Sequence, residues 1–509
     1  MVINTPYYNK ILRIVTISAL AFMVCWGLVL VLAKLRPFWT DEWRLIYNLK
    51  FRSTASLWGP LDYTQQCPRV YLQAIKAFTG MFGYSYFSLR LPSFLVGTAT
   101  IIFSYKLMNQ LYKPDSVTRF ILVFLVISSV TFTDYFVQVK QYTMEILLSI
   151  VAIWQMAAII RIGNHLFPHK ALYAVLCASF FAAPFFSYTY PIAASPVFIV
   201  AFFQGILQIR KAADNSRKMS TLLLQWIPLV FCAAGILLFY KIDASKVMGD
   251  TQMHGYWNYR MITGGTGFLF VTGMLWDLFK QLGTGFIFEI ILGILGICAF
   301  AWNIFWLARN YRKPVLETID WIRLYSILVV AFTIVLFFAG KMPIEPKFNV
   351  FATASMAILI IWLMDYLLVN PRVRTLSAVL LALLYVEMAG NLVTSAINQV
   401  TASEYVKRMN IYRATEKAII YAQENKFPIM VTPGVAYPDE ITKYVPNFSP
   451  ISAAAVLKTF PAYSNVQNLP VYSVDNLSDI EGNMRKLPGH VKAVLADDGL
   501  TYTVVAIKD

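Results

Sequence analysis

Long apolar stretches alternate with short polar segments over most of the chain. They approach the roughly 20 residues that cross a bilayer core of about 30 Å, and they recur up to about residue 397. Backbone in lipid must satisfy its own hydrogen bonds, so the stretches predict helices. We expect about eleven transmembrane helices, with a range of 10 to 13, over residues 11–33, 86–108, 120–133, 142–160, 171–187, 192–209, 222–240, 283–307, 324–340, 348–369 and 376–397.

Basic residues mark every second loop between these stretches. The first stretch is too long for a signal peptide and lacks a small-residue cleavage site, so we expect it to be retained. The positive-inside rule makes the basic loops cytoplasmic, and it places segments 34–85 and 241–281 and the tail outside. The basic residues gather at 10–13, 113–119, 161–170, 210–218, 309–323 and 372–374.

Two external segments are long enough to carry a function. Segment 34–85 opens with LRPFWTDEWRLIYNLKF (35–51), where apolar and aromatic residues alternate with basic ones. This pattern is typical of an amphipathic helix in the membrane interface, and a second helix is expected over 70–81. Segment 241–281 is rich in glycine and aromatic residues, which indicates either a mobile loop over a site or a disordered connection.

The composition becomes that of a soluble protein after about residue 400. This change predicts a small extracytoplasmic α/β domain at 401–509, behind a transmembrane domain at 1–400. Helices are expected over 404–425 and 477–486, and strands over 428–433, 471–474, 492–497 and 501–507.

Composition excludes a water-soluble fold and narrows the chemistry. Hydrophobic residues make up 58% of the 509 positions and charged residues only 14%, which is far too apolar for a soluble protein. The net charge of +16 comes mostly from the cytoplasmic loops, so it does not indicate nucleic-acid binding. The chain has four histidines and five cysteines and no HExxH, CxxC or P-loop pattern. Zinc hydrolase, redox and nucleotide hydrolase functions therefore lose their usual support.

The first external segment places Asp41 and Glu42 side by side at the membrane surface. Acidic residues favour the first turn of a helix, so capping alone explains such a pair. The same side of the membrane also gathers basic residues at apolar helix ends, and a cation buried there needs an anion. A protein carboxylate, a lipid headgroup or a phosphate substrate could supply it, and the set as a whole favours the phosphate. The basic residues are Arg44, Arg69, Arg90, Lys140, Lys341 and Lys347.

Four motifs in order give the sequence a family resemblance. The chain resembles the membrane glycosyltransferases of the GT-C fold, in particular the bacterial relatives of protein O-mannosyltransferases and of the lipid A aminoarabinose transferase. One departure is Cys67, which stands where those relatives have His or Lys before the proline, and the charge follows here as Arg69. The motifs are WTDEWRLIY (39–47), QQCPRVYLQAIKAFTGMFGYSYFSLRLPSFLVG (65–97), VKQYTMEILL (139–148) and GKMPIEPKFNVF (340–351).

The resemblance implies an enzyme that moves a hexose or pentose from a polyprenyl-phosphate donor to an external acceptor. It favours Asp41 as the general base that takes the acceptor proton. Glu42 would orient Asp41, bind the acceptor or help to hold a metal. Cations would stabilise the phosphate leaving group. The donor-phosphate candidates are Arg69, Arg90, Lys140, Lys341 and Lys347, and the further substrate-binding candidates are Tyr142, Arg44 and Tyr259.

The sequence requires no cofactor, although it is compatible with a divalent cation. Expected partners are the polyprenyl-phosphate sugar, a lipid, glycan or protein acceptor and membrane lipids, but no nucleic acid. A bacterial inner membrane is the natural location, with the active site facing the periplasm. One alternative is a transporter or flippase of lipid-linked saccharides, but the chain has no internal repeat. The other is a polymerase or ligase, although segment 241–281 is poor in the expected Arg and His.

Overall fold

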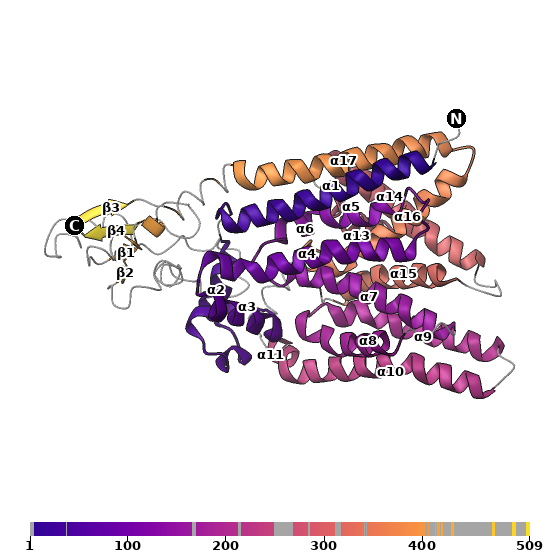
Figure 1. The fold of residues 1–509 in the computed structure, drawn as a ribbon, viewed down its shortest axis with the longest axis horizontal. Coiled ribbons are helices and arrows are strands. Elements are labelled where there is room, and N and C mark those ends of the chain that lie inside the picture. The colour runs from indigo at the N-terminus through magenta and orange to yellow at the C-terminus, as the bar shows by residue number, and fades with distance from the viewer. Residues whose placement is uncertain are drawn as a thin grey trace.

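Helices that run along a common direction form a bundle, and a small sheet lies at one end of the molecule (Figure 1). The computed structural model of the chain describes residues 5–36, 38–164, 169–211, 215–248, 268–283, 286–310, 317–339, 342 and 344–402, and in the tail 406, 413, 415–417, 419–420, 429–431, 471–473, 491–494 and 505–508.

Nine helices within these ranges are long and apolar enough to cross a membrane. They confirm the predicted polytopic helical fold. The nine are α1 (Thr5–Leu32), α4 (Tyr86–Leu111), α7 (Tyr142–Gly163), α9 (Tyr190–Lys211), α10 (Asn215–Phe239), α14 (Phe286–Asn310), α15 (Thr318–Phe338), α16 (Thr353–Val369) and α17 (Arg374–Thr401).

Two of the predicted spans form helices shorter than a full crossing. The span at 120–133 divides into α5 (Phe120–Ser128) and α6 (Val130–Tyr135). The division occurs because Ser129 is extended and its hydroxyl accepts the Phe132 amide, which starts a new helix. All of α5 is buried, so it lies inside the bundle. The span at 171–187 becomes α8 (Lys170–Ala182), continued by a 3₁₀ turn (Ala183–Phe186).

Segment 34–85 contains both helices that the sequence predicts. The expected contact of the first helix with the membrane interface is not what the structure gives, because its apolar residues pack against protein. Trp43, Leu45, Ile46 and Leu49 are all buried, so this helix belongs to the folded body. The elements are α2 (Thr40–Phe51), 3₁₀ turns at Ser56–Trp58 and Asp62–Thr64, and α3 (Arg69–Phe82).

Segment 241–281 is not the continuous loop that the sequence predicts. A π-helical turn (Tyr240–Ala244) prolongs α10 into α11 (Ser245–Met248), and α13 (Phe268–Lys280) packs against α14. The apolar residues of α13 fit against glycines of α14: a Cβ at Gly296 would come within 1.9 Å of the Phe279 ring. The remainder of the predicted loop, 249–267, lies outside the described residues.

Four short strands of the tail form one sheet in the order β2-β1-β4-β3. β1 pairs in parallel with β2, where Ile429 faces Val471, and antiparallel with β4, where Ile429 faces Ile507. Each strand overlaps a predicted one, whereas the helix expected at 477–486 lies outside the described residues. The α/β domain as a separate unit stays a prediction. The strands are β1 (Ile429–Val431), β2 (Val471–Ser473), β3 (Val491–Val494) and β4 (Val505–Lys508).

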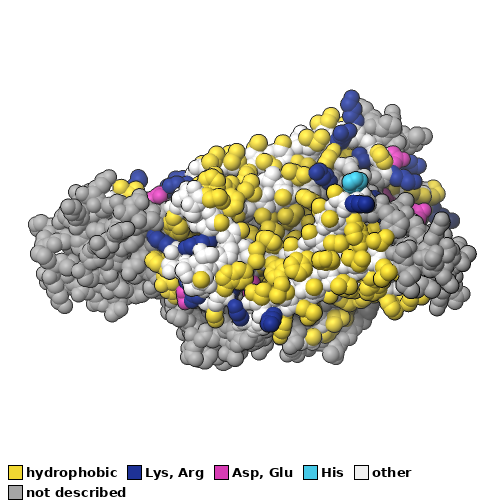
Figure 2. All heavy atoms as spheres, turned by 60° about the horizontal axis from the view of Figure 1, so that its bottom comes forward, with side chains coloured by type: hydrophobic (Ala, Val, Ile, Leu, Met, Phe, Trp, Pro, Cys, Tyr) yellow, Lys and Arg dark blue, Asp and Glu magenta, His cyan; other side chains and the backbone are white. Residues whose placement is uncertain are grey.

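Figure 2 shows hydrophobic side chains along the flank of the bundle, with Lys and Arg mostly toward its ends.

Close packing between α1 and α4 fixes the segment that leads into α7. Inside, the Phe136 ring fits against Gly27 and Gly97, where an added Cβ would come within 2.3 and 2.1 Å of it. Phe136 starts the segment 136–141, so these glycines help to position Lys140.

Candidate active site

The buried Glu42 side chain caps the N-terminus of α2. Its Oε2 accepts the Trp39 amide at 2.9 Å, and its Oε1 accepts the Val139 amide at 2.7 Å. The side chain is fully buried, and a buried carboxylate needs such partners. Glu42 therefore ties the first turn of α2 to segment 136–141, far away in the sequence.

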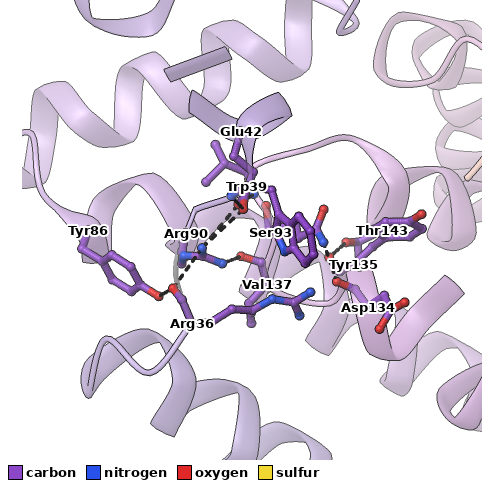
Figure 3. A network of polar contacts seen from close by, with 12 residues as sticks. Arg36, Trp39, Glu42, Tyr86, Arg90, Ser93, Asp134, Tyr135, Val137 and Thr143 are labelled. Carbon is purple, nitrogen blue, oxygen red and sulfur yellow. Dashed lines mark hydrogen bonds and ion pairs between the residues drawn. The ribbon is translucent and has the colours of Figure 1, made fainter. Parts of the chain in front are cut away.

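Helix α4 supplies the cation that balances this carboxylate. An Arg90 nitrogen lies 3.5 Å from Glu42, and the guanidinium donates to the carbonyls of Val137 at 2.8 Å and Arg36 at 3.3 Å. The Phe38 ring centre lies 4.5 Å from the guanidinium carbon. Figure 3 shows the Arg90 guanidinium between Glu42, Arg36 and Val137. We call Glu42, Arg90 and the backbone groups they bind the Glu42 network. Because Arg90 binds Glu42 and two backbone carbonyls inside the protein, it stabilises the fold and is a weaker candidate for a phosphate ligand.

Asp41 lies next to Glu42 in the chain but in a different environment. Its side chain is 54% exposed and lies 3.8 Å from Arg44, one turn along α2. Burial among the surrounding protein raises its pKa, yet the charges of Lys140, Arg44 and Lys347 together lower the pKa below its usual 3.8. Asp41 is therefore an ionised carboxylate that a substrate can reach.

Lys140 brings a buried ammonium to this region from the turn before α7. The residue is only 5% exposed, and its Nζ donates to Gln65 Oε1 at 2.6 Å. Burial lowers the pKa of Lys140, against the opposing effect of Asp41. An ammonium has three donors, and within the described residues Gln65 is its one hydrogen-bond partner. A neutral amide does not balance the charge, and the nearby Asp41 is the anion that acts on it.

Lys347 approaches from the segment before α16. Its Nζ lies 3.7 Å from a Glu345 oxygen and 5.2 Å from the Phe348 ring centre, and its charge is one of those that lower the pKa of Asp41. Three separate segments thus bring cations to one carboxylate. Lys341 lies outside the described residues. We call Asp41, Arg44, Lys140, Lys347 and Tyr142 the Asp41 cluster.

Arg69, the first residue of α3, is held by an acidic residue of the π-helical turn. Its amide donates to Asp243 Oδ2 at 2.7 Å, and its Nε lies 3.9 Å from Oδ1. Tyr188 donates its hydroxyl to the same carboxylate at 2.9 Å. The Arg69–Asp243 pair is nearly inaccessible to solvent, since the two side chains are 2% and 3% exposed. The charge of Arg69 is already matched, which makes it a weaker phosphate candidate than Lys140.

The Cys67 side chain cannot take the role of the basic residue that the sequence resemblance leads us to expect before Pro68. Its side chain is buried, and burial raises the pKa of the thiol to about 12, so it stays neutral. Its carbonyl accepts Arg69 Nη1 at 2.9 Å and the Tyr188 hydroxyl at 3.1 Å. The backbone of Cys67 therefore positions Arg69, and the side chain is a small apolar group at a turn.

Aromatic residues complete the cluster. Tyr142 is the first residue of α7 and follows Lys140 by two residues. Its ring centre lies 4.4 Å from that of Tyr135. Tyr259, the other predicted aromatic ligand, lies outside the described residues.

Sequence reasoning missed Gln65, Tyr135 and Asp243. Gln65 and Tyr135 carry no charge: Gln65 opens the quoted motif at 65–97 without a role of its own, and Tyr135 lies four residues before the motif at 139–148. Asp243 was assigned to a loop, and only the continuation of α10 brings it to α3. Within the described ranges, no three His, Cys, Asp or Glu side chains gather as a metal-ligand group.

Comparison with known proteins gives likeness in structure only. No family model and no curated protein matches the chain. The structure is similar to ArnT from Cupriavidus metallidurans bound to undecaprenyl phosphate, with a TM-score of 0.48, 12% identity and 97% of each chain covered. ArnT in the apo state gives a TM-score of 0.47 at 12% identity, again over 97% of each chain. The Archaeoglobus fulgidus oligosaccharyltransferase in complex with Zn and sulfate gives 0.43 at 11% identity, covering 90% of this chain and 62% of that one.

These neighbours are GT-C enzymes. At TM-scores of 0.48 and below, the likeness has no weight in assigning a reaction to this chain, which has to come from its own residues.

Proposed function

We propose that this chain is an integral membrane glycosyltransferase that moves a sugar from a polyprenyl-phosphate donor to an acceptor hydroxyl on the extracytoplasmic side. One observation carries the proposal: a reachable, ionised Asp41 stands among cations that include the buried Lys140 ammonium, whose hydrogen-bond partner is a neutral amide. A base and an unmatched cation together are what this transfer requires.

Lys140 is the group we assign first to the donor phosphate. A buried ammonium without an anion is unfavourable, and a phosphate oxygen would take the donors that Gln65 leaves over. Lys347 is the second residue that we assign to the donor phosphate, because its side chain is partly exposed and its Nζ lies 3.7 Å from the Glu345 carboxylate, which is longer than a hydrogen bond. Arg44 holds Asp41 in place at 3.8 Å and belongs to the same positive surroundings.

The proposed reaction is a single displacement at the anomeric carbon of the donor sugar. Asp41 takes the proton of the acceptor hydroxyl as its oxygen forms the new bond to that carbon. The bond from the anomeric carbon to the phosphate oxygen breaks, and its electron pair leaves on the polyprenyl phosphate. Lys140 and Lys347 stabilise the charge that develops there.

Asp41 is the proposed base, and Glu42 is not. Both oxygens of Glu42 accept backbone amides and its charge faces Arg90. These contacts occupy both oxygens of the buried carboxylate and exclude a substrate. Glu42 instead holds the first turn of α2 against segment 136–141, so it keeps Asp41 and Lys140 near one another.

Binding of a defined lipid tests this assignment. Native mass spectra of the full-length protein would be recorded with added undecaprenyl phosphate for wild type, Asp41→Asn and Lys140→Met. Wild type and Asp41→Asn should retain the lipid, while Lys140→Met should retain at least tenfold less. Lys76→Met is the matched control. Lys76 is a half-buried lysine of α3 that donates to the Leu49 carbonyl of α2.

Two outcomes would contradict the proposal. If wild type retains undecaprenyl phosphate no better than phosphatidylglycerol of the same concentration, the donor class is wrong. Equal loss of lipid in Lys76→Met and Lys140→Met would mean that Lys140 acts through the fold alone.

A further inference from the structure

Two tyrosine rings meet beside Asp41, at the junction of two helices. Tyr135 ends α6 and Tyr142 begins α7. Their ring centres lie 4.4 Å apart, with the planes inclined by 43°. The Thr143 hydroxyl donates to the Tyr135 carbonyl at 2.8 Å, which fixes the end of α6 against the start of α7. The two rings therefore form one surface held by the backbone.

Both rings keep accessible polar ends. Tyr135 and Tyr142 are each partly exposed. In the described part of the chain neither hydroxyl makes a hydrogen bond, and neither is among the buried polar atoms that lack one. Two fully buried tyrosines do bond within the protein: the Tyr71 hydroxyl bonds to Ser93 at 2.9 Å, and the Tyr190 hydroxyl bonds to Gln155 at 2.6 Å. The two hydroxyls at the junction are thus open to a ligand.

The backbone around the pair connects it to the Asp41 cluster. Glu42, the neighbour of Asp41 in the chain, accepts the Val139 amide at 2.7 Å, and Tyr142 follows Val139 by three residues. Tyr142 also follows Lys140, whose Nζ donates to Gln65, by two residues. The surface therefore borders both the proposed base and the segments that carry the proposed phosphate ligands.

We propose that Tyr135 and Tyr142 form the subsite for the sugar ring of the donor. Resting on the proposed function, this assigns the ligand class as a pyranose or furanose ring whose C–H face packs on the aromatic surface. A tyrosine suits such a ligand because it offers an apolar face and a polar end, and a few placed polar groups fix a ligand's orientation. The sugar then lies between the Lys140 phosphate site and Asp41, where the acceptor hydroxyl must arrive.

The test compares lipids that differ only in the sugar. Full-length protein in nanodiscs would be incubated with an equimolar mixture of undecaprenyl phosphate and its glucosyl, mannosyl and arabinosyl esters, and retained lipid would be read by native mass spectrometry. Wild type should prefer at least one glycosylated lipid to the bare phosphate by roughly five- to tenfold. Tyr142→Ala and Tyr135→Ala should reduce that preference to about twofold or less, while bare lipid still binds.

Conservative variants separate sugar binding from packing. Tyr142→Phe and Tyr135→Phe keep the ring contact and remove only the hydroxyl, so each should retain part of the preference and lose roughly two- to fivefold. Tyr240→Ala, an exposed tyrosine at the end of α10, is the control and should keep the wild-type preference.

Each failure points to a different error. Retention of no undecaprenyl lipid by wild type would overturn the proposed function itself. Wild type that binds all four lipids equally would overturn the sugar subsite and leave the phosphate assignment standing. A wild-type preference that survives both alanine variants would place the sugar elsewhere. Loss of all lipid binding in the phenylalanine variants would mean that the pair is part of the phosphate site.

Discussion

Asp41 and Glu42 are adjacent in the chain, yet the protein uses their charges in opposite ways. In the Glu42 network the carboxylate accepts two amides and faces Arg90, all of it buried. In the Asp41 cluster the carboxylate is 54% exposed with its arginine 3.8 Å away, and the buried Lys140 bonds to an amide oxygen. A motif that pairs two acids therefore divides its work: one carboxylate holds the structure together, and the other is left available for chemistry.

Removing the carboxylate of Asp41 gives the largest expected effect on transfer. Asp41→Asn should lower the transfer rate by about 10²- to 10⁴-fold, the usual contribution of a general base. Because the side chain is largely exposed, the free energy of unfolding should change by no more than about 0.5 kcal/mol. Sugar transfer in membranes that carry the native donor and acceptor measures the first, and thermal unfolding in detergent the second. Normal transfer by Asp41→Asn would end its role as the base.

Removing the neighbouring carboxylate should instead affect folding. Glu42→Ala leaves Arg90 buried without its anion, which typically lowers the free energy of unfolding by about 3–5 kcal/mol. Combining it with Arg90→Met should recover part of that loss, because no uncompensated charge then remains. Thermal unfolding of the two variants measures the difference. The comparison fails if Glu42→Ala keeps wild-type stability but loses transfer as Asp41→Asn does, since both acids would then be chemical.

Lys140 offers a sharper contrast between binding and folding. Lys140→Met should weaken undecaprenyl phosphate binding at least tenfold, while the protein stays as stable as wild type or gains up to about 1 kcal/mol. The reason is that a buried ammonium bonded to a neutral amide is unfavourable for the fold. Burial is also the main reason that the pKa of Lys140 is lowered in the folded protein. The unfolded state therefore binds this proton more tightly, so the free energy of unfolding should rise with pH between the folded pKa and the ordinary pKa. A large loss of stability in Lys140→Met would make this lysine a structural residue.

The fold was largely predictable from the sequence because a membrane imposes simple rules. Apolar length located the nine described helices that are long enough to cross a membrane, and residue patterns located α2, α3 and the four strands. Helix α13 was missed because it lies next to a glycine-rich stretch that indicates a loop. The buried position of α2 was missed because an amphipathic pattern cannot say whether protein or lipid covers the apolar face.

The site was predictable only in part, for a similar reason. Charge and order along the chain pointed to Asp41, Lys140 and Lys347. In the structure the charges of both lysines lower the pKa of Asp41, and their roles in a reaction stay a prediction. Their places at helix starts favoured Lys140 and Lys347 over Arg69 and Arg90. A sequence does not reveal, however, which cation already has a carboxylate partner. That information came from Asp243 and Glu42 in three dimensions.

The pH dependence of transfer should reflect the cations around Asp41. Its pKa lies below 3.8, because the charges of Lys140, Arg44 and Lys347 outweigh the effect of burial. The base is therefore ionised at neutral pH, and transfer should fall only as the pH drops through that lowered pKa. Lys347→Met removes one of the cations, so the acid limb of the rate profile should move to higher pH. The same linkage predicts a small stabilisation by Asp41 that is present above pH 3.8 and disappears as the pH falls through the folded pKa.

A pH profile of transfer for wild type and Lys347→Met measures the shift. Lys246→Met is a suitable control, because Lys246 is exposed and donates to the Trp58 carbonyl at 2.8 Å, outside the Asp41 cluster. An acid limb that stays in place in Lys347→Met, or that moves as far in Lys246→Met, would remove Lys347 from the cluster.

The smallest effect is expected from an acidic residue that belongs to neither region. Asp62 accepts two bonds from Arg52, at 2.9 and 2.7 Å, but the two side chains are 42% and 22% exposed. Exposed pairs contribute about 0–1 kcal/mol, so Asp62→Asn should change the free energy of unfolding by less than about 1 kcal/mol and leave transfer at the wild-type rate. Thermal unfolding and transfer assays beside Asp41→Asn measure both. Asp62 has Arg52 as its cation and is not part of the Asp41 cluster. A loss of transfer in Asp62→Asn would therefore mean that transfer responds to the removal of any carboxylate from the external face, and not to the Asp41 cluster in particular.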